Sequence, residues 1–398
     1  MADVAQDMQT PRAERIHIGL FGRCNSGKSA LLNAITGQNV AIVSELAGTT
    51  TDPVSKSMEL PDLGAVVLVD TAGLDDATML GQERMSRTLT AMDSVDIALL
   101  LFAGEDTSLE EDILQRMKHR EIKVVPIISK SDLLSDVEPF AERLSRLTGE
   151  KPLCVSAKTG EGIDELRKKI ASAVERDQRL LTDGLCEAGD TVMLVMPQDK
   201  QAPVGRIIKP QVQTLRELLD RGCNAVCCTL ESMPSALKTL AEPPHLIIAD
   251  SQVFDAVNKL KPEASRLTSF SVLFARYKGD IEEFVKAAKV LSKLTPSSRV
   301  LIAEACAHIP QTEDIGRVKL PRMLRRKFGE TLQIDIVGGK EFPEDLSRYD
   351  LVIHCGACMF NRRLVMSRVA QAKEQGVPIS NYGVVIAALT GILDKVVY

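Results

Sequence analysis

Residues 22–29 read Gly-Arg-Cys-Asn-Ser-Gly-Lys-Ser, and this stretch decides the fold of the first part of the chain. It fits the pattern G-x-x-x-x-G-K-S/T. The stretch directly follows an apolar run at 16–21 and opens a helical pattern at 29–35, which is the strand–loop–helix context that the pattern requires. Glycines let backbone N–H groups close around phosphate oxygens, and the helix N-terminus adds its dipole. We therefore predict a nucleotide phosphate site here; the alternative is a chance glycine-rich turn.

Outward from this loop, apolar runs alternate with helical patterns such as 163–174. The runs predicted as strands are 16–21, 65–69, 97–102, 124–128 and 153–155. Strands that alternate with helices indicate a parallel, doubly wound sheet. The sequence thus predicts an α/β domain at 15–176, after a disordered N-terminus at 1–14.

The rest of the chain is predicted to form two smaller α/β domains after a polar linker at 177–190. The first, 191–266, has predicted strands at 191–196, 225–229 and 245–249 and a helix at 212–221. The second, 267–398, has predicted strands at 271–275, 299–303, 333–337, 351–354 and 378–380. Its predicted helices are 281–291, 320–327 and 363–374.

Composition narrows the function classes. The chain has 398 residues, a formal net charge of −5 and a pI of about 5.7, so it lacks the basic character of most nucleic-acid binders. No apolar stretch is long enough for a transmembrane helix, and the polar N-terminus does not resemble a signal peptide. We therefore expect a cytoplasmic protein that binds neither membrane nor nucleic acid. In that reducing compartment its nine cysteines are thiols or metal ligands, not disulfides.

Residues in three segments are predicted to contact the phosphates or the Mg²⁺ ion. Lys28 is expected to reach the β- and γ-phosphates and Ser29 to bind Mg²⁺. Asp70, which ends the run 65–69, is placed to hold Mg²⁺ through water, and the Gly73 amide to sense the γ-phosphate. Thr50, in the Thr-rich loop 48–52, offers the metal a hydroxyl; the alternative is a solvated turn. The remaining predicted nucleotide contacts of the loop are Gly22, Asn25, Ser26, Gly27 and Ala30.

Two further segments predict which base is read. Residues 129–132, Ser-Lys-Ser-Asp, follow the run 124–128 and are similar to the guanine-reading Asn-Lys-x-Asp motif, with Ser129 in place of Asn. The Asp132 carboxylate can accept both N–H donors on the edge of guanine, which adenine cannot supply, and Lys130 can lie over the ring. Ser156, Ala157 and Lys158 resemble the second guanine-contacting motif. We therefore predict GTP and GDP as the nucleotides.

Cysteine and histidine cluster in two short motifs near the end of the chain. One is Cys306-Ala307-His308 and the other is His354-Cys355-Gly356-Ala357-Cys358. Both follow apolar runs, and ligands gather at the carboxyl ends of strands in an open α/β sheet. The residue types alone are compatible with two kinds of metal at this site. Zinc would take a closed tetrahedral set of three cysteines and one histidine. An iron–sulfur cluster held by three cysteines would keep one iron free for an exchangeable ligand.

The nucleotide motifs resemble the Era and tRNA-modifying TrmE branch of the translation-factor class of GTPases. Leu74 stands where Ras-like proteins carry a water-orienting Gln. In the branch, a P-loop Asn helps to hold K⁺, and Asn25 occupies that position. The resemblance therefore implies slow, potassium-stimulated hydrolysis with Lys28, Asn25, Thr50, Asp70 and Gly73 as catalytic residues. Gln82 or Glu83 could orient water, although a solvated surface loop is the alternative.

The combination of such a GTPase with both cysteine motifs is similar to the family of [FeFe]-hydrogenase maturation GTPases. The likeness also includes 205–219, 246–252 and 267–280. It implies a GTPase domain, a dimerisation domain at 191–266 and a [4Fe-4S] cluster domain at 267–398. Cys306, Cys355 and Cys358 match the cluster ligands of the family, and His308 or His354 is a candidate fourth ligand.

The resemblance also implies the function. Members of the family act as homodimeric scaffolds that receive the diiron precursor made with two radical-SAM maturases and deliver it to the apo-[FeFe]-hydrogenase. Two alternatives remain open at this point. One is an RNA-processing GTPase, which the acidic charge and the scarcity of aromatic residues disfavour. The other is a regulatory GTPase stabilised by zinc, without a cluster.

Overall fold

The computed structural model of the chain divides into two compact units, Met1–Asp177 and Gln178–Tyr398, and each is described by itself. It describes residues 14–37, 54–60, 63–71, 73–74, 88–174, 179–197, 207–305, 314–339, 341–357 and 360–398. The predicted disordered segment 1–14 lies outside these residues apart from Glu14. No helix in the described ranges is long and apolar enough to cross a membrane.

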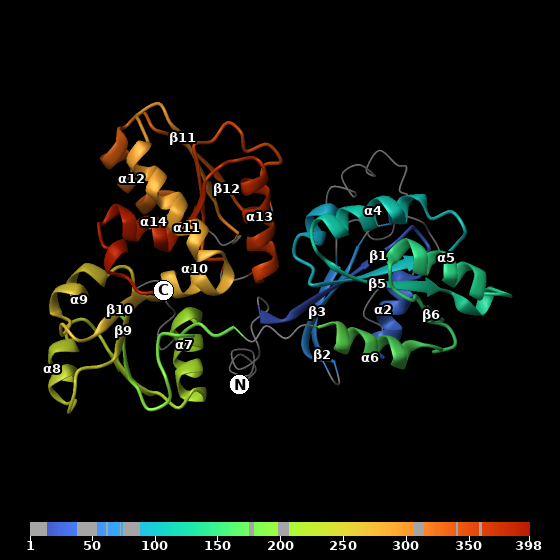
Figure 1. Cartoon of the computed structure of the whole chain (residues 1–398), viewed down its shortest axis with the longest axis horizontal. Helices are drawn as coiled ribbons and strands as arrows, with labels where there is room; N and C mark the ends of the chain where they lie inside the picture. Colours follow the sequence, from blue (N-terminus) through green and yellow to red (C-terminus); the bar gives the residue numbers. More distant parts are fainter. Residues whose placement is uncertain are drawn as a thin grey trace. The chain divides into compact units, whose positions relative to one another are not determined.

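One twisted sheet organises the first unit (Figure 1). Its described strands are β1 (Ile16–Phe21), β2 (Val54–Leu60), β3 (Gly64–Asp70), β4 (Ile97–Phe102), β5 (Lys123–Ser129) and β6 (Leu153–Val155). They lie in the order β2-β3-β1-β4-β5-β6, and only β2 runs antiparallel to its neighbour. The central strand β4 is buried along its whole length, as its unbroken apolar sequence requires.

Helices cover both faces of this sheet. Helices α2 (Lys28–Thr36) and α6 (Ile163–Ala173) pack their apolar residues on one face. Helices α4 (Ser108–His119) and α5 (Glu138–Thr148) pack on the other, as Figure 1 shows. The predicted doubly wound, mainly parallel domain is confirmed. The antiparallel strand β2 was not predicted, because its sequence Val-Ser-Lys-Ser-Met-Glu-Leu has no continuous apolar run.

The second unit contains two four-stranded parallel sheets. The first has the order β10-β9-β7-β8, from β7 (Thr191–Val195), β8 (Asn224–Cys228), β9 (Leu246–Ala249) and β10 (Arg266–Ser269). Its associated helices are α7 (Lys209–Asp220), α8 (Met233–Lys238) and α9 (Phe254–Leu260). The second has the order β12-β11-β13-β14, from β11 (Arg299–Ala303), β12 (Gln333–Val337), β13 (Leu351–His354) and β14 (Ile379–Asn381). The remaining helices are α10 (Phe270–Lys278), α11 (Ile281–Ala288), α12 (Leu320–Phe328), α13 (Arg362–Glu374) and α14 (Tyr382–Leu389).

One predicted strand is wrong: residues 271–275 lie in helix α10. Five apolar residues of this helix are buried, so its sequence lacks an exposed polar stripe. Such a short apolar run cannot be told from a strand by its periodicity. The Ser269 hydroxyl accepts the N–H of Val272 and caps the helix. The strand lies just before it, as β10, which pairs with β9 across the predicted domain boundary at 266/267.

The predicted polar linker is fastened to the second unit over its described residues, 179–190. Leu181 and Cys186 are buried there. The Glu217 carboxylate on α7 accepts the backbone N–H groups of Leu181 (2.7 Å) and Thr182 (2.8 Å). This segment is therefore part of the core of the second unit and not a free tether.

The C-terminal residues close back onto the first sheet of the second unit. Ile392 and Val396 join the buried cluster of Met193. The Val397 N–H donates to the Leu267 carbonyl at 3.0 Å. The two sheets of this unit therefore share packing, which is consistent with their grouping in one compact unit.

Candidate functional site

The phosphate loop lies between β1 and α2. Gly27, directly before α2, has φ +94°, a left-handed conformation that glycine adopts without strain. Asn25 also has positive φ, at 58°, and is exposed. Asparagine is one of the few other residues that tolerate this region. The loop therefore presents its backbone in the form that phosphate binding requires, with Ala30 in the first turn of α2.

Lys28 is oriented by the loop itself. Its ammonium Nζ donates to the carbonyls of Gly22 (2.9 Å) and Arg23 (2.8 Å), and the residue is only 8% exposed. These contacts hold the charge at the loop without a bound nucleotide. The predicted role of Lys28 at the phosphates is compatible with this placement.

Ser29 and Asp70 meet at the start of α2. The Ser29 hydroxyl donates to Asp70 Oδ2 at 2.6 Å, although the two residues are 41 positions apart. Asp70 is 2% exposed, and its other oxygen, Oδ1, has no hydrogen-bond partner within the described part of the chain. Burial raises the pKa of the Asp70 carboxyl, against the opposite effects of the Ser29 hydrogen bond and the Lys28 charge.

This donor set fits Mg²⁺. Mg²⁺ takes oxygen ligands and usually keeps several waters, and a buried carboxylate oxygen without a partner is costly unless it meets a cation. Ser29 and Asp70 would supply the hydroxyl and the carboxylate. The third predicted magnesium ligand, Thr50, lies outside the described residues.

Gly73 approaches the phosphate loop more closely than any side chain would allow. A Cβ built on Gly73 would lie 2.2 Å from Cys24 Sγ and 2.6 Å from the Cys24 nitrogen. The next residue, Leu74, donates its N–H to the Gly22 carbonyl at 3.3 Å and buries its side chain with Phe21. Leu74 therefore faces the core and cannot orient water. Gln82 and Glu83 lie outside the described residues.

The base-reading segments come together at the ends of β5 and β6. Asp132 is exposed and its Oδ1 accepts the hydroxyl of buried Ser156 at 2.6 Å. Lys130 is exposed with φ 56°, and its Cε would lie 3.9 Å from a Cβ on Gly27, so its stem passes by the phosphate loop. The neighbouring Ala157 is half-buried and Lys158 is exposed. This arrangement leaves the second carboxylate oxygen of Asp132 available for a base.

Ser129 has a role that the motif comparison did not predict. Its hydroxyl is buried and donates to the Ser26 carbonyl at 2.7 Å, and it also lies 3.3 Å from the Phe102 carbonyl. It thereby joins the end of β5 to the phosphate loop. A small hydroxyl in place of the asparagine is sufficient for this contact.

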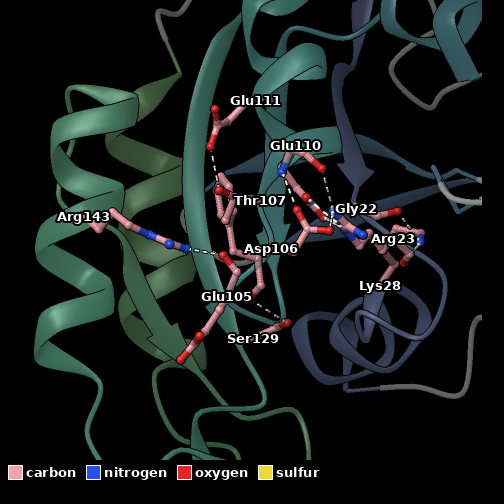
Figure 2. A network of polar contacts seen from close by, with 12 residues as sticks. Gly22, Arg23, Lys28, Glu105, Asp106, Thr107, Glu110, Glu111, Ser129 and Arg143 are labelled. Carbon is pink, nitrogen blue, oxygen red and sulfur yellow. Dashed lines mark hydrogen bonds and ion pairs between the residues drawn. The ribbon is translucent and has the colours of Figure 1, made fainter.

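An ion-pair network beside the loop was also missed. Figure 2 shows Arg23 directed at Glu110 and Asp106 at the start of α4. The available signals were a charged residue inside the loop and acidic residues after a strand. The sequence could not show which of these charged residues pair, because Arg23 and Glu110 are 87 positions apart.

The cysteine and histidine motifs are only partly described. Cys306, His308 and Cys358 lie outside the described residues. Strands β11 and β13 pair in parallel with Ala303 opposite His354, so the segments that follow them leave the sheet at one edge. In the described ranges, no three side chains of metal-ligand type come together.

Cys355 has the surroundings of a thiolate ligand. It is buried, and its Sγ accepts the N–H groups of Ala305 (3.0 Å) and Ala357 (3.4 Å). Such hydrogen bonds stabilise negative charge on sulfur and tune iron–sulfur clusters. Ala305 directly precedes the Cys306 motif in the sequence, so this hydrogen bond joins Cys355 to the end of the segment that follows β11. A buried cysteine sulfur is a suitable ligand for zinc or for an iron–sulfur cluster.

His354 is committed to other partners. Its Nε2 lies 3.0 Å from Arg368 Nη1, and its Nδ1 lies 2.7 Å from the Cys355 carbonyl. Because Arg368 can only donate, we assign the ring proton to Nδ1. Burial, together with the Arg368 charge, lowers the pKa of His354 to about 3. His354 could bind iron only if Arg368 moved away.

A buried lysine holds the loop around the second motif. Lys278 Nζ, on α10, donates to the carbonyls of Ala357 and Phe360, both at 2.8 Å. Lys278 is 4% exposed. The same loop is held from β14, since Asn381 Nδ2 donates to the Cys355 carbonyl at 3.2 Å.

The other described cysteines differ in exposure. Cys186 and Cys223 are buried with their sulfurs 3.7 Å apart, and burial and the neighbouring thiol raise the pKa of Cys223 to about 11. The raised pKa keeps the Cys223 thiol protonated near neutral pH. Cys227 is exposed and lies on the edge strand β8.

Comparison with known families divides the chain into three regions. A family model described as the hydrogen maturase F dimerization domain matches residues 181–279, and one described as the hydrogen maturase F tetramerization domain matches 282–398. Together they cover more than half of the chain. A third, described as 50S ribosome-binding GTPase, matches 17–130.

Individual relatives such as the following two match less than half of the chain. The tRNA modification GTPase MnmE of Dichelobacter nodosus is 38% identical over 173 residues, which is 41% of this chain and 36% of the relative. The GTPase Der of Wolinella succinogenes is 36% identical over 174 residues, 41% of this chain and 37% of the relative. The chain thus spans little more than a third of the length of these relatives. A structure of Era with MgGDPNP and a 16S ribosomal RNA fragment covers 57% of this chain and 98% of its own, with 19% identity and a TM-score of 0.38, too low to bear on function.

Proposed function

The chain belongs to the hydrogen maturase F type of GTPase, since two domain models of that family match behind a GTPase domain, and from this premise we propose that it acts as a GTP-hydrolysing scaffold. In this proposal the protein binds and hydrolyses GTP and carries a [4Fe-4S] cluster. It holds the diiron precursor of the [FeFe]-hydrogenase active site as cargo and delivers it to the apo-hydrogenase. The observation that carries the proposal is that one chain contains both a phosphate loop and Cys355, which follows a strand inside the matched maturase domains.

The GTPase part is supported by the residues around the phosphate loop. Lys28 is oriented by two carbonyls, and the partly unpaired Asp70 carboxylate beside Ser29 suits Mg²⁺. Asp132, held by Ser156, favours guanine over adenine. Leu74 offers no group to orient water, so we expect slow intrinsic hydrolysis.

We propose that K⁺ stimulates this hydrolysis through Asn25. The residue is exposed on the phosphate loop in a left-handed conformation, so its amide oxygen is accessible to a monovalent cation. The test compares initial rates of GTP hydrolysis in KCl and NaCl at equal ionic strength, with Asn25→Ala as the matched variant. Faster hydrolysis in K⁺ that is lost in the variant supports the role, whereas equal rates in the two salts reject it.

The cluster part rests on Cys355 with Cys306 and Cys358 as partners, and on His308 or His354 as the fourth ligand. Of the two histidines, we favour His308, because both ring nitrogens of His354 have other contacts. A [4Fe-4S] cluster with three thiolates keeps one iron whose ligand can exchange. Such an iron could hold and release a second unit, which is the chemistry that a carrier requires.

The deciding experiment is spectroscopy of the anaerobically reconstituted protein. We expect broad absorbance near ~400 nm and an S = 1/2 EPR signal after reduction, as a [4Fe-4S] cluster gives. Cys355→Ser should lose both signals, whereas the exposed Cys227→Ser should keep them. A colourless protein that binds one zinc per chain would instead indicate a regulatory GTPase with a structural metal.

The partners follow from the same proposal. The matched domains are described as dimerization and tetramerization domains, which supports self-association, and we propose a homodimer as the basic assembly. The apo-hydrogenase and the radical-SAM maturases are the proposed exchange partners. Activation of an apo-hydrogenase by the cargo-loaded protein, and its absence with Cys355→Ser, would test delivery.

A further inference from the structure

Arg23, inside the phosphate loop, is fixed by the start of helix α4. Its Nε lies 3.2 Å from each carboxylate oxygen of Glu110. Its Nη2 lies 2.9 Å from Asp106 Oδ2 and 3.3 Å from Ser108 Oγ. Figure 2 shows the side chains of Glu110 and Asp106 directed at the Arg23 guanidinium. One charged group of the loop therefore meets three residues of a single segment, 106–110.

Glu110 is the strong partner in this network. Its side chain is 2% exposed, whereas that of Asp106 is 70% exposed and its pairing is screened by water. A buried carboxylate is tolerated when a cation and hydrogen bonds compensate its lost hydration. Arg23 supplies both through a charge-assisted contact with the two oxygens. The pairing raises the pKa of Arg23, although partial burial acts in the opposite direction.

The segment that carries Glu110 is itself anchored. Arg143 on α5 donates to the Glu105 carbonyl, and the Thr107 hydroxyl donates to Glu111 at 2.6 Å (Figure 2). Helix α4 also packs Ile113 and Leu114 on the sheet. Glu110 is therefore a fixed point against which the phosphate loop can be held.

The pairing bears on the catalytic lysine. Arg23 and Lys28 are linked because the Arg23 carbonyl accepts the Lys28 ammonium at 2.8 Å. Movement of the Arg23 backbone would shift one of the two carbonyls that orient this charge. Catalytic groups act efficiently only when held in a near-productive geometry by their supporting contacts.

We propose that Glu110 is a positioning residue of the nucleotide site, acting through Arg23 to hold the carbonyl that orients Lys28 toward the phosphates. This inference rests on the proposed GTP hydrolysis and adds a supporting residue from α4 that the loop motif does not contain. It requires no contact between Glu110 and the nucleotide.

The test uses full-length protein and the variants Glu110→Gln, Arg23→Gln, their double variant and Arg23→Lys. Steady-state hydrolysis gives kcat/KM for GTP, and the ³¹P resonance of the β-phosphate of bound GDP reports its contact with Lys28. Glu110→Gln and Arg23→Gln should each lower kcat/KM by tenfold or more and shift the β-phosphate resonance. The double variant should have a kcat/KM no lower than that of the less active single variant, because both substitutions remove the same interaction. Arg23→Lys should restore part of the loss.

Asp112→Asn is the matched control, because it removes an exposed ion pair with Arg116 on the same helix. It should leave kcat/KM and the resonance unchanged. The inference is overturned if Glu110→Gln stays within twofold of this control and the resonance does not move. If Glu110→Gln fails to fold, Arg23→Gln decides instead: kcat/KM and a β-phosphate resonance unchanged from those of the control would reject the positioning role. Absence of GTP hydrolysis in the unmodified protein would reject the proposed function, not this pairing alone.

Discussion

At the scale of single residues, the nucleotide site depends on small residues that pack closely against the phosphate loop. Gly73 lies so near Cys24 that hydrogen is the only side chain it can carry. The Ser129 hydroxyl donates a hydrogen bond to the Ser26 carbonyl of the phosphate loop. The loop is thus held from the ends of two strands, β3 and β5. Small residues at these positions allow the strands to approach the loop closely.

Gly73→Ala should disable the nucleotide site. The added Cβ would overlap Cys24 Sγ and also lie 2.6 Å from the Cys24 backbone nitrogen, so the loop itself must shift. We expect at least a tenfold loss of GTP hydrolysis, about 1.4 kcal/mol of lost transition-state stabilisation. Steady-state kinetics measures this. Gly104→Ala, where a Cβ has open space, is the control and should behave as the unmodified protein.

At the scale of elements, helix α10 matters more than its length suggests. It follows β10 of one sheet, and its last residue, Lys278, reaches the loop after β13 of the other. Ser269 starts the helix by accepting the Val272 N–H, so the position of Lys278 is fixed relative to β10. The loop around Cys355 therefore depends on an element of the neighbouring sheet.

Lys278→Met should weaken the cluster site without affecting hydrolysis. Methionine has a similar length but cannot donate, so the Ala357 and Phe360 carbonyls would lose a charged donor. We expect reduced iron content and a broadened or diminished EPR signal after reconstitution, measured beside GTP hydrolysis. Lys286→Met, which changes an exposed lysine on α11, is the control. An iron content equal to that of the control would show that this hydrogen bonding is dispensable.

At the scale of the whole molecule, two chemistries are placed in two separate compact units. The phosphate loop belongs to Met1–Asp177 and the cysteine motifs to Gln178–Tyr398. Each has its own hydrophobic core, with the clusters of Leu99 and of Ile353 as examples. Local damage in one unit should therefore leave the other folded.

Two variants test this independence. Lys28→Ala should abolish GTP hydrolysis and leave the reconstituted cluster intact, because Lys28 donates to two carbonyls of the phosphate loop in the first unit. Cys355→Ser should lose the cluster and leave hydrolysis nearly unchanged. Both activities are measured in each variant. A tenfold effect in the opposite unit would mean that the two units are tightly coupled.

The sequence by itself determined the phosphate loop, the parallel α/β class and most strands, because these depend on local features. A continuous apolar run such as 97–102 is buried whatever its neighbours are, and the loop motif is contiguous. The same local character placed Cys355 directly after a strand. Strand β13 pairs in parallel with β11, so the two strands end at one edge of the sheet, which agrees with that expectation.

Tertiary structure alone decided the contacts between distant positions. Glu110 beside Arg23 and Lys278 beside Ala357 depend on how strands and helices pack, and no local pattern records them. Residues 271–275 are helical, although this short, largely buried apolar run lacks the polar stripe that distinguishes a helix from a strand in the sequence. The physical reason is common to these cases. Local sequence fixes which segments are apolar or glycine-rich, but only packing fixes which of them meet.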